Sequence, residues 1–120
     1  MNLDITNSEA LRFPEATVYV VNSDSSQSTG FLRLGPVGSL DKHNRPVEEW
    51  LVQVEGTSII KLFDKDKEVK AVTLKRGDSL RIPANQFHQH TNQEQTESLT
   101  SWHFDGDITE IIEQQRKKAK

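Results

Sequence analysis

Two segments of this chain place histidines next to short, partly apolar runs of residues. The first segment, residues 43–56, contains His43 and Glu49, and the second, residues 77–92, contains His88. Side chains on neighbouring strands meet on one face of a sheet even when they are far apart in sequence. These residues therefore predict a pocket between the two segments, and the rest of the chain is expected to serve as its scaffold.

The overall composition favours a single all-β domain. A chain of 120 residues has the length of one domain, so we expect one domain over residues 1–120. Its hydrophobic share of 33% is low and its charged share of 28% is slightly high. These proportions suit an antiparallel sheet protein with one face in water better than a helical bundle.

Composition also argues against several kinds of function. The formal net charge is −3, so the chain lacks the basic excess that favours nucleic acid. It has no cysteine, which excludes disulfides and thiolate metal sites. The first residues lack the features of a signal peptide, and no apolar run approaches membrane-spanning length. We therefore expect a cytoplasmic protein with no nucleic-acid partner and no membrane partner.

Short apolar runs separated by turn residues predict seven or eight strands. The runs are 17–21, 31–34, 49–55, 59–63, 69–74, 79–82, 87–91 and 99–104. They are rich in β-branched and aromatic residues, and turn signals separate them about every 8–12 residues. This pattern favours a sandwich or barrel of antiparallel strands.

The sequence patterns at the two ends of the chain differ from those of the predicted strands. Residues 1–16 show no clear period and are expected to form an N-terminal arm. Residues 107–120 predict a short helix and tail, opened by a capping box of Asp107 and Glu110. The basic residues at the end suit a helix C-terminus, where the macrodipole favours cations.

The two histidine segments match the two motifs of a known family. The matching residues are Gly38, His43, Glu49 and Gly56 in the first segment, and Gly77, Pro83, His88 and Asn92 in the second. On these residues the chain resembles the cupins, which are small jelly-roll β-barrels. The resemblance implies an all-β, cupin-like jelly-roll barrel with a short C-terminal helix and a pocket for a small molecule. Because small cupins commonly pair and edge strands need protection, we also expect a homodimer.

Two positions depart from the family pattern. Asn85 stands where the family prefers glycine, a mild change because asparagine tolerates positive φ. Arg45 stands where the family has a second histidine, which removes one expected metal ligand. The resemblance therefore implies His43, Glu49 and His88 as metal ligands. His90 lies two residues past His88, on the same strand face, and is a candidate for the missing ligand.

These residues leave open whether a metal is bound. Two histidines and a carboxylate suit non-haem iron, and iron, manganese, nickel and zinc are all candidates. A guanidinium about 5 Å from a dication would oppose its binding by several kcal/mol at an effective dielectric of about 20. An outward-facing Arg45 therefore fits a metal site. An inward-facing Arg45 fits a metal-free pocket, in which it pairs with Glu49 or binds a carboxylate or phosphate of a ligand.

Three functions follow from these alternatives. The first is a metal-dependent cupin enzyme, an oxygenase (such as a dioxygenase) or isomerase acting on a small molecule. The second is a metal-free small-ligand or carbohydrate-binding cupin, in which His43 or His88 would be the general base of any reaction. The third is a barrel that mainly dimerises. Beyond the metal set, the candidate ligand-binding residues are Arg45, Trp50 and His103.

Overall fold

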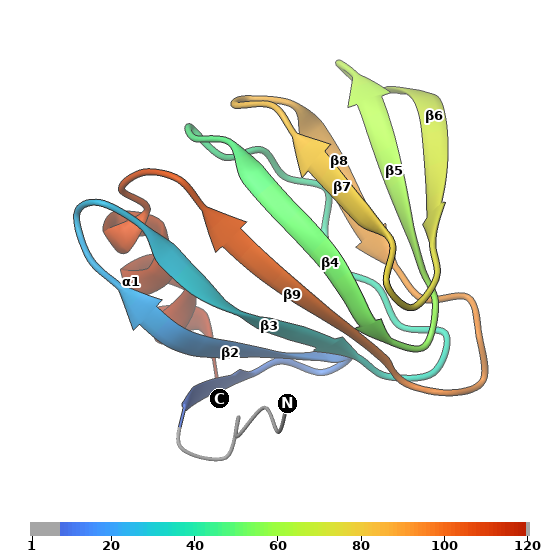
Figure 1. Cartoon of the computed structure of the whole chain (residues 1–120), viewed down its shortest axis with the longest axis horizontal. Coiled ribbons are helices and arrows are strands. Elements are labelled where there is room, and N and C mark those ends of the chain that lie inside the picture. Colours follow the sequence, from blue (N-terminus) through green and yellow to red (C-terminus); the bar gives the residue numbers. More distant parts are fainter. Residues whose placement is uncertain (1–7, 120) are drawn as a thin grey trace.

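Two antiparallel sheets and one helix make up residues 8–119, the part of the chain that the computed structural model describes. The elements are β1 (Glu9–Arg12), β2 (Ala16–Ser23), β3 (Ser28–Leu34), β4 (Glu49–Glu55), β5 (Ser58–Asp64), β6 (Lys67–Leu74), β7 (Ser79–Ile82), β8 (Phe87–Thr91), β9 (Ser98–Phe104) and α1 (Thr109–Lys118). One sheet has the order β1-β2-β3-β9-β4-β7 and the other the order β6-β5-β8 (Figure 1). The prediction of an all-β jelly roll with a short C-terminal helix is confirmed.

The core lies between the two sheets and follows the alternation of side chains along the strands. In β4, Glu49, Leu51 and Gln53 are buried, whereas Trp50 and Val52 are exposed. The apolar cluster draws on both sheets and the helix. It comprises Leu11, Ala16, Val20, Leu32, Leu34, Leu51, Ile60, Leu74, Ile82, Trp102, Phe104, Ile108 and Ile112.

The segment that precedes β4 runs antiparallel to an edge of β8. Ser39 pairs with Thr91, and His43 pairs with His88. The N–H of His43 donates to the carbonyl of His88 at 2.9 Å, and the reverse hydrogen bond measures 2.8 Å. This segment therefore extends the three-stranded sheet, and the two histidine segments of the sequence lie side by side.

Three turn residues of the two motifs adopt positive φ. Gly56 has φ 70°, Gly77 has φ 90° and Asn85 has φ 68°. A Cβ at Gly56 would collide with the carbonyl oxygen of Glu97, so this turn requires glycine. At Asn85, asparagine takes the left-handed conformation that glycine would otherwise provide. The N–H of Asn85 donates to the carbonyl of Arg45 at 2.7 Å, which joins the turn before β8 to the first histidine segment.

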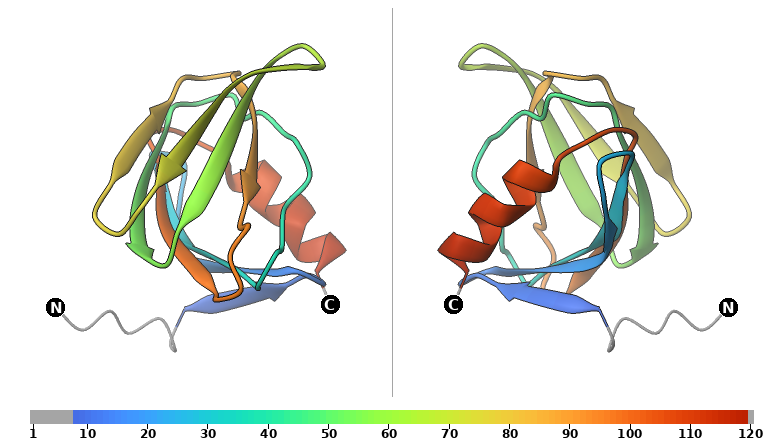
Figure 2. Two further views of the ribbon diagram at one scale, coloured as in Figure 1. Left: turned by 90° about the vertical axis from the view of Figure 1, so that its right-hand side faces the viewer. Right: turned by 90° about the vertical axis from the view of Figure 1, so that its left-hand side faces the viewer.

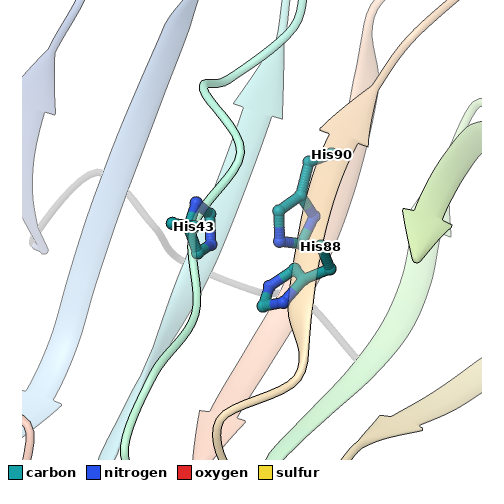
Figure 3. Close-up of side chains that lie close together, drawn as sticks. All are labelled: His43, His88 and His90. Atoms are coloured by element: carbon teal, nitrogen blue, oxygen red, sulfur yellow. The ribbon is translucent and has the colours of Figure 1, made fainter. Parts of the chain in front are cut away.

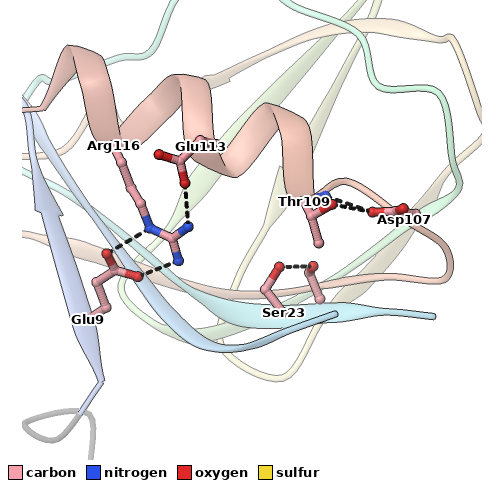
Figure 4. Close-up of polar contacts among 7 residues, drawn as sticks. Glu9, Ser23, Asp107, Thr109, Glu113 and Arg116 are labelled. Atoms are coloured by element: carbon pink, nitrogen blue, oxygen red, sulfur yellow. Dashed lines mark hydrogen bonds and ion pairs between the residues drawn. The ribbon is translucent and has the colours of Figure 1, made fainter. Parts of the chain in front are cut away.

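The start of the helix differs from the prediction. Helix α1 begins at Thr109, and its N-cap residue, Ile108, makes no side-chain capping hydrogen bond. Asp107 accepts hydrogen bonds from the backbone N–H and the hydroxyl of Thr109 at 2.9 and 2.7 Å (Figure 4). The predicted capping box of Asp107 and Glu110 is therefore wrong, because the aspartate lies one residue before the N-cap.

The predicted N-terminal arm contains an ordered strand that contacts the helix. Within residues 1–16, β1 pairs with β2. Arg116 donates to both carboxylate oxygens of Glu9 at 2.8 Å, in a two-pronged ion pair that joins the last turn of α1 to β1 (Figure 4). Residues 1–7 of the arm and Lys120 of the tail lie outside the described residues. Figure 2 shows the C-terminal end of α1 close to β1, as the ion pair between Arg116 and Glu9 requires.

No helix within residues 8–119 is long and apolar enough to cross a membrane.

We expect Asn92→Ala to destabilise the fold by roughly 2–3 kcal/mol. The buried Asn92 amide donates to the carbonyls of Gly35 and Thr96 at 2.9 and 2.8 Å, and its oxygen accepts from the N–H of Glu94 at 3.0 Å. Alanine would leave these backbone groups without partners. Urea denaturation would measure the change, with the exposed Gln93→Ala as control. A loss no larger for Asn92→Ala than for the control would contradict this account.

Candidate metal centre

Three histidines converge between the segment before β4 and strand β8. One ring nitrogen from each of His43, His88 and His90 lies within 4.8 Å of the others. The ring centroids are 4.5 Å apart for His43 and His88, 5.6 Å for His43 and His90, and 5.2 Å for His88 and His90. Figure 3 shows the three imidazoles facing one another across the two adjacent segments. The structure thus brings the candidate ligand His90 into the group.

Hydrogen bonds to backbone carbonyls orient two of these rings. The Nδ1 of His43 lies 3.0 Å from the carbonyl of Asp41, and the Nδ1 of His88 lies 2.9 Å from the carbonyl of Gln86. A carbonyl accepts only, so Nδ1 must carry the hydrogen in both rings. In a neutral ring the lone pair is then on Nε2. Carbonyl partners that fix the tautomer in this way are typical of metal-ligating histidines.

Glu49 lies beside this group and contacts one of its members. Its side chain is inward on β4 and only 4% exposed. Oε1 of Glu49 lies 3.2 Å from Nε2 of His88, although the two atoms are not aligned as a hydrogen bond. The predicted ligands His43, Glu49 and His88 therefore lie near one another. The group whose ligand atoms all lie within 4.8 Å of one another consists of the three histidines and does not include Glu49.

Three buried atoms in this site have no hydrogen-bond partner among the described residues. They are Oε1 of Glu49, Nε2 of His88 and Nδ1 of His90. Buried polar atoms are rarely left unpaired, because each costs about 1–3 kcal/mol. A cation bound beside these atoms would satisfy both Oε1 of Glu49 and Nε2 of His88, which lie 3.2 Å apart.

The donor set fits a divalent first-row metal, and the three histidines lie close to the spacing that such an ion requires. These ions bond to imidazole nitrogen at about 2.1 Å, so the nitrogens of neighbouring ligands lie about 3.0–3.4 Å apart. The three histidine nitrogens, all within 4.8 Å of one another, would each move toward the ion by up to about an ångström. Imidazole nitrogens with one carboxylate suit zinc, iron, nickel and manganese.

Burial keeps His43 and His90 unprotonated at neutral pH. It lowers the pKa of His43 from 6.5 to about 3, with further lowering by the charge of Arg45 and by His88. Burial also holds the pKa of His90 well below its ordinary value, with contributions from His88, His43 and Arg45. Neutral imidazole is the form that binds metal, so burial prepares both rings for that role.

Arg45 faces the site rather than the solvent. Its side chain is half-buried and lies among the residues that line the cavity next to His43 and Glu49. Burial lowers the pKa of its guanidinium, and the Glu49 carboxylate acts in the opposite direction. Of the two directions that the sequence leaves open for Arg45, the structure shows the inward one. Among the described residues Arg45 makes no ion pair with Glu49 within 4.0 Å; its Nη1 donates to the carbonyl of Asn44 at 3.1 Å.

A cavity of about 800 Å³ opens beside the histidines. Its polar lining includes His43, Asn44, Arg45, Glu49 and His90. Its apolar lining includes Phe13, Val18, Leu32, Trp102, Phe104, Ile108, Ile111 and Ile112. His88 is 1% exposed and does not belong to the lining. The cavity falls within the range of about 300–1,000 Å³ that is typical of small-molecule sites.

Two predicted ligand-binding residues lie outside this cavity. Trp50 is 44% exposed and pairs in register with His103 on the neighbouring strand β9. Both side chains project from the outer face of the six-stranded sheet, since their neighbours Leu51 and Trp102 point inward. We therefore remove Trp50 and His103 from the candidate site. Trp102, one residue from His103, is the indole that reaches the cavity.

Solved structures share this fold. The oxalate decarboxylase of Lactobacillus farciminis has a TM-score of 0.76 at 20% identity, covering 87% of this chain and 32% of that protein. An RmlC-like cupin from Shewanella frigidimarina has a TM-score of 0.75 at 12% identity, covering 92% of this chain and 94% of that one. At these identities the likeness shows the fold alone.

Sequence comparison is more specific. The chain is 32% identical over 54 residues to 3-hydroxyanthranilate 3,4-dioxygenase of Mycosarcoma maydis, an alignment that covers 45% of this chain and 30% of that protein. The chain therefore matches only about a third of the length of the dioxygenase and of the decarboxylase. The sequence profile of the family described as Cupin domain matches residues 30–103, more than half of the chain. The chain therefore belongs to the cupin domain family.

Proposed function

We propose that the protein binds a divalent first-row metal ion through His43, His88 and His90, with Glu49 as the adjacent carboxylate. With this ion it would act on a small organic molecule as an oxygenase or isomerase. The observation that carries the proposal is the set of buried, unpartnered atoms on Glu49, His88 and His90. A cation at this point would satisfy all three, and the neutral state of His43 and His90 suits metal better than a proton.

Related cupins support the proposal without naming the ion. The Bacillus subtilis oxalate decarboxylase, which has Mn(II) centres, shares the fold with a TM-score of 0.76 at 17% identity, covering 86% of this chain and 29% of that protein. The relative from Mycosarcoma maydis is a dioxygenase. Iron, manganese, nickel and zinc remain the candidate ions, because each accepts imidazole and carboxylate ligands.

Different residues of the chain would have different roles in such a reaction. A bound metal would supply Lewis acidity toward an oxygen atom of the substrate. The carbonyls of Asp41 and Gln86 hold the His43 and His88 rings in fixed tautomers, so these ligands need little reorganisation. The apolar side chains around Trp102 and Phe104 would displace water from the reacting molecule, which would strengthen its polar interactions with the rest of the cavity.

We expect the purified, tag-free protein to contain close to one equivalent of metal. His43→Ala and His90→Ala should each weaken metal binding by at least about a hundredfold, since each removes a ligand. His103→Ala removes a histidine from the outer face and should leave the metal content unchanged. Plasma mass spectrometry and metal titrations would measure these quantities. The proposal fails if folded protein neither contains metal nor takes it up from manganese, iron, nickel or zinc solutions.

Replacing Arg45 is expected to tighten metal binding. Arg45→Gln removes a half-buried cation near the site, and the lost repulsion should raise metal affinity about tenfold or more. Arg45→His removes the same charge and adds an imidazole, so it should bind metal at least as tightly as the glutamine variant. Competition with a chelating dye would measure these affinities. Unchanged affinity in both variants would show that Arg45 lies too far away to affect the ion.

The stability of the metal-free protein should decrease as the pH is lowered below about 6.5. Because the folded pKa of His43 lies near 3, the unfolded chain binds more protons than the folded chain between these two values. Each such histidine contributes a loss of up to about 1.4 kcal/mol per pH unit. Urea denaturation between pH 7 and 5 would measure the slope. His43→Gln should make it shallower, and an equal slope in that variant would contradict the assignment.

A further inference from the structure

The lining of the cavity contains both polar and apolar residues. Its polar part includes two of the histidines, Arg45 and the acids Glu15, Asp41 and Glu49, and its apolar part includes Trp102, Phe104 and the isoleucines of α1. A ligand that fills such a cavity needs one polar end and an apolar body. A two-carbon diacid would leave the apolar part facing water in a space of about 800 Å³.

Three cationic residues line the cavity, but their surroundings differ. Lys42 is held by Asp66 at 3.2 Å and lies over the Phe63 ring, 4.9 Å from its centroid. Lys118 is exposed on the last turn of α1. Arg45 is half-buried, and among the described residues its guanidinium makes a single hydrogen bond, to the Asn44 carbonyl. Arg45 is therefore the cation with unused donors inside the cavity.

The charges around Arg45 favour one class of anion. A guanidinium presents parallel N–H groups that match the two oxygens of a carboxylate. A phosphate carries more charge and more acceptor oxygens, and it would need further donors. The other two cations of the lining do not supply such donors, because Lys42 is held by Asp66 and Lys118 lies on the exposed last turn of α1.

We propose that the cavity binds an amphipathic carboxylate, such as an arylalkyl or medium-chain alkyl acid, with its carboxylate on Arg45 and its apolar body against Trp102, Phe104 and Ile111. This inference deepens the proposed function by naming the class of its substrate. The ligand also explains the presence of a cation beside a metal site. Its negative charge neutralises Arg45, so ligand and metal should each tighten the binding of the other by the same factor.

The chain offers a built-in reporter for this binding. It has two tryptophans, Trp102 at the cavity and Trp50 on the outer face. The Trp50→Phe variant therefore carries one indole, which lines the cavity. Quenching or a spectral shift of its fluorescence would report occupancy in metal-free protein, which separates this test from the question of metal binding.

The test uses 3-phenylpropionate, its neutral amide and propionate as probes of metal-free Trp50→Phe protein. We expect 3-phenylpropionate to bind about tenfold or more tightly than the amide, which lacks the charge, and than propionate, which lacks the apolar body. Adding Arg45→Gln should remove the preference for the acid over the amide, and Arg45→Lys should restore part of it. Arg81→Gln, on the outer strand β7, is the matched control and should bind like the parent.

Several outcomes would overturn the proposal. They are equal binding of the acid and the amide, unchanged binding in a folded Arg45→Gln variant, or no binding of 3-phenylpropionate by the parent. Tighter, Arg45-dependent binding of phenyl phosphate would replace the carboxylate class with phosphorylated ligands.

A second titration, of Mn²⁺ with and without 3-phenylpropionate, tests the coupling between metal binding and ligand binding. Carboxylate binding without any metal uptake would refute the metal proposal alone, and metal uptake without carboxylate binding would refute the ligand class alone.

Discussion

The site depends on the backbone pairing between the segment before β4 and strand β8. Reciprocal hydrogen bonds join His43 to His88, and further bonds join the N–H of Leu40 to the carbonyl of His90 at 3.0 Å and the N–H of Asn92 to the carbonyl of Gly38 at 2.8 Å. These bonds fix which residues of the two segments lie opposite each other. A slip of one residue would turn a histidine to the other face of the sheet and take it out of the group.

Burial then determines the protonation and the solvation of His43 and His90. The same desolvation that lowers the pKa of His43 and His90 also deprives their lone pairs of water. Neutral, poorly solvated nitrogens lie here next to a buried carboxylate. The free energy of binding a dication should therefore be more favourable at this site than at an exposed one. Glu49 belongs to β4 of the six-stranded sheet, whereas the histidines belong to the other sheet and its added segment. A metal held by all of them would connect the two sheets and couple its binding to the stability of the fold.

Motif spacing and strand alternation predicted much of this arrangement. The resemblance to the cupin motifs implied His43, Glu49 and His88 as ligands, and the two-residue period of a strand placed His90 on the face of His88. Alternation separates the two faces of β4 but does not say which one is inside. The sequence predicts a pocket position for Trp50, but the buried face of β4 is the one that carries Glu49 and Gln53, and Trp50 lies on the other. The predicted capping box is wrong for a related reason. The pattern does not fix the first residue of the helix, and the same residues can precede a helix that begins one or two positions later.

The direction of Arg45 lay beyond what spacing can predict, because a long, flexible side chain can reach either side of its segment. Its inward position has an energetic consequence. A half-buried guanidinium loses hydration, and it repels any cation that the neighbouring histidines and Glu49 attract. A protein selected for metal affinity alone would gain from a neutral residue at this position. An anionic ligand reverses both costs, because it pairs with the guanidinium and reduces the positive potential at the metal site. Arg45 therefore makes the affinity of the site for metal lower when the cavity is empty than when it holds a carboxylate.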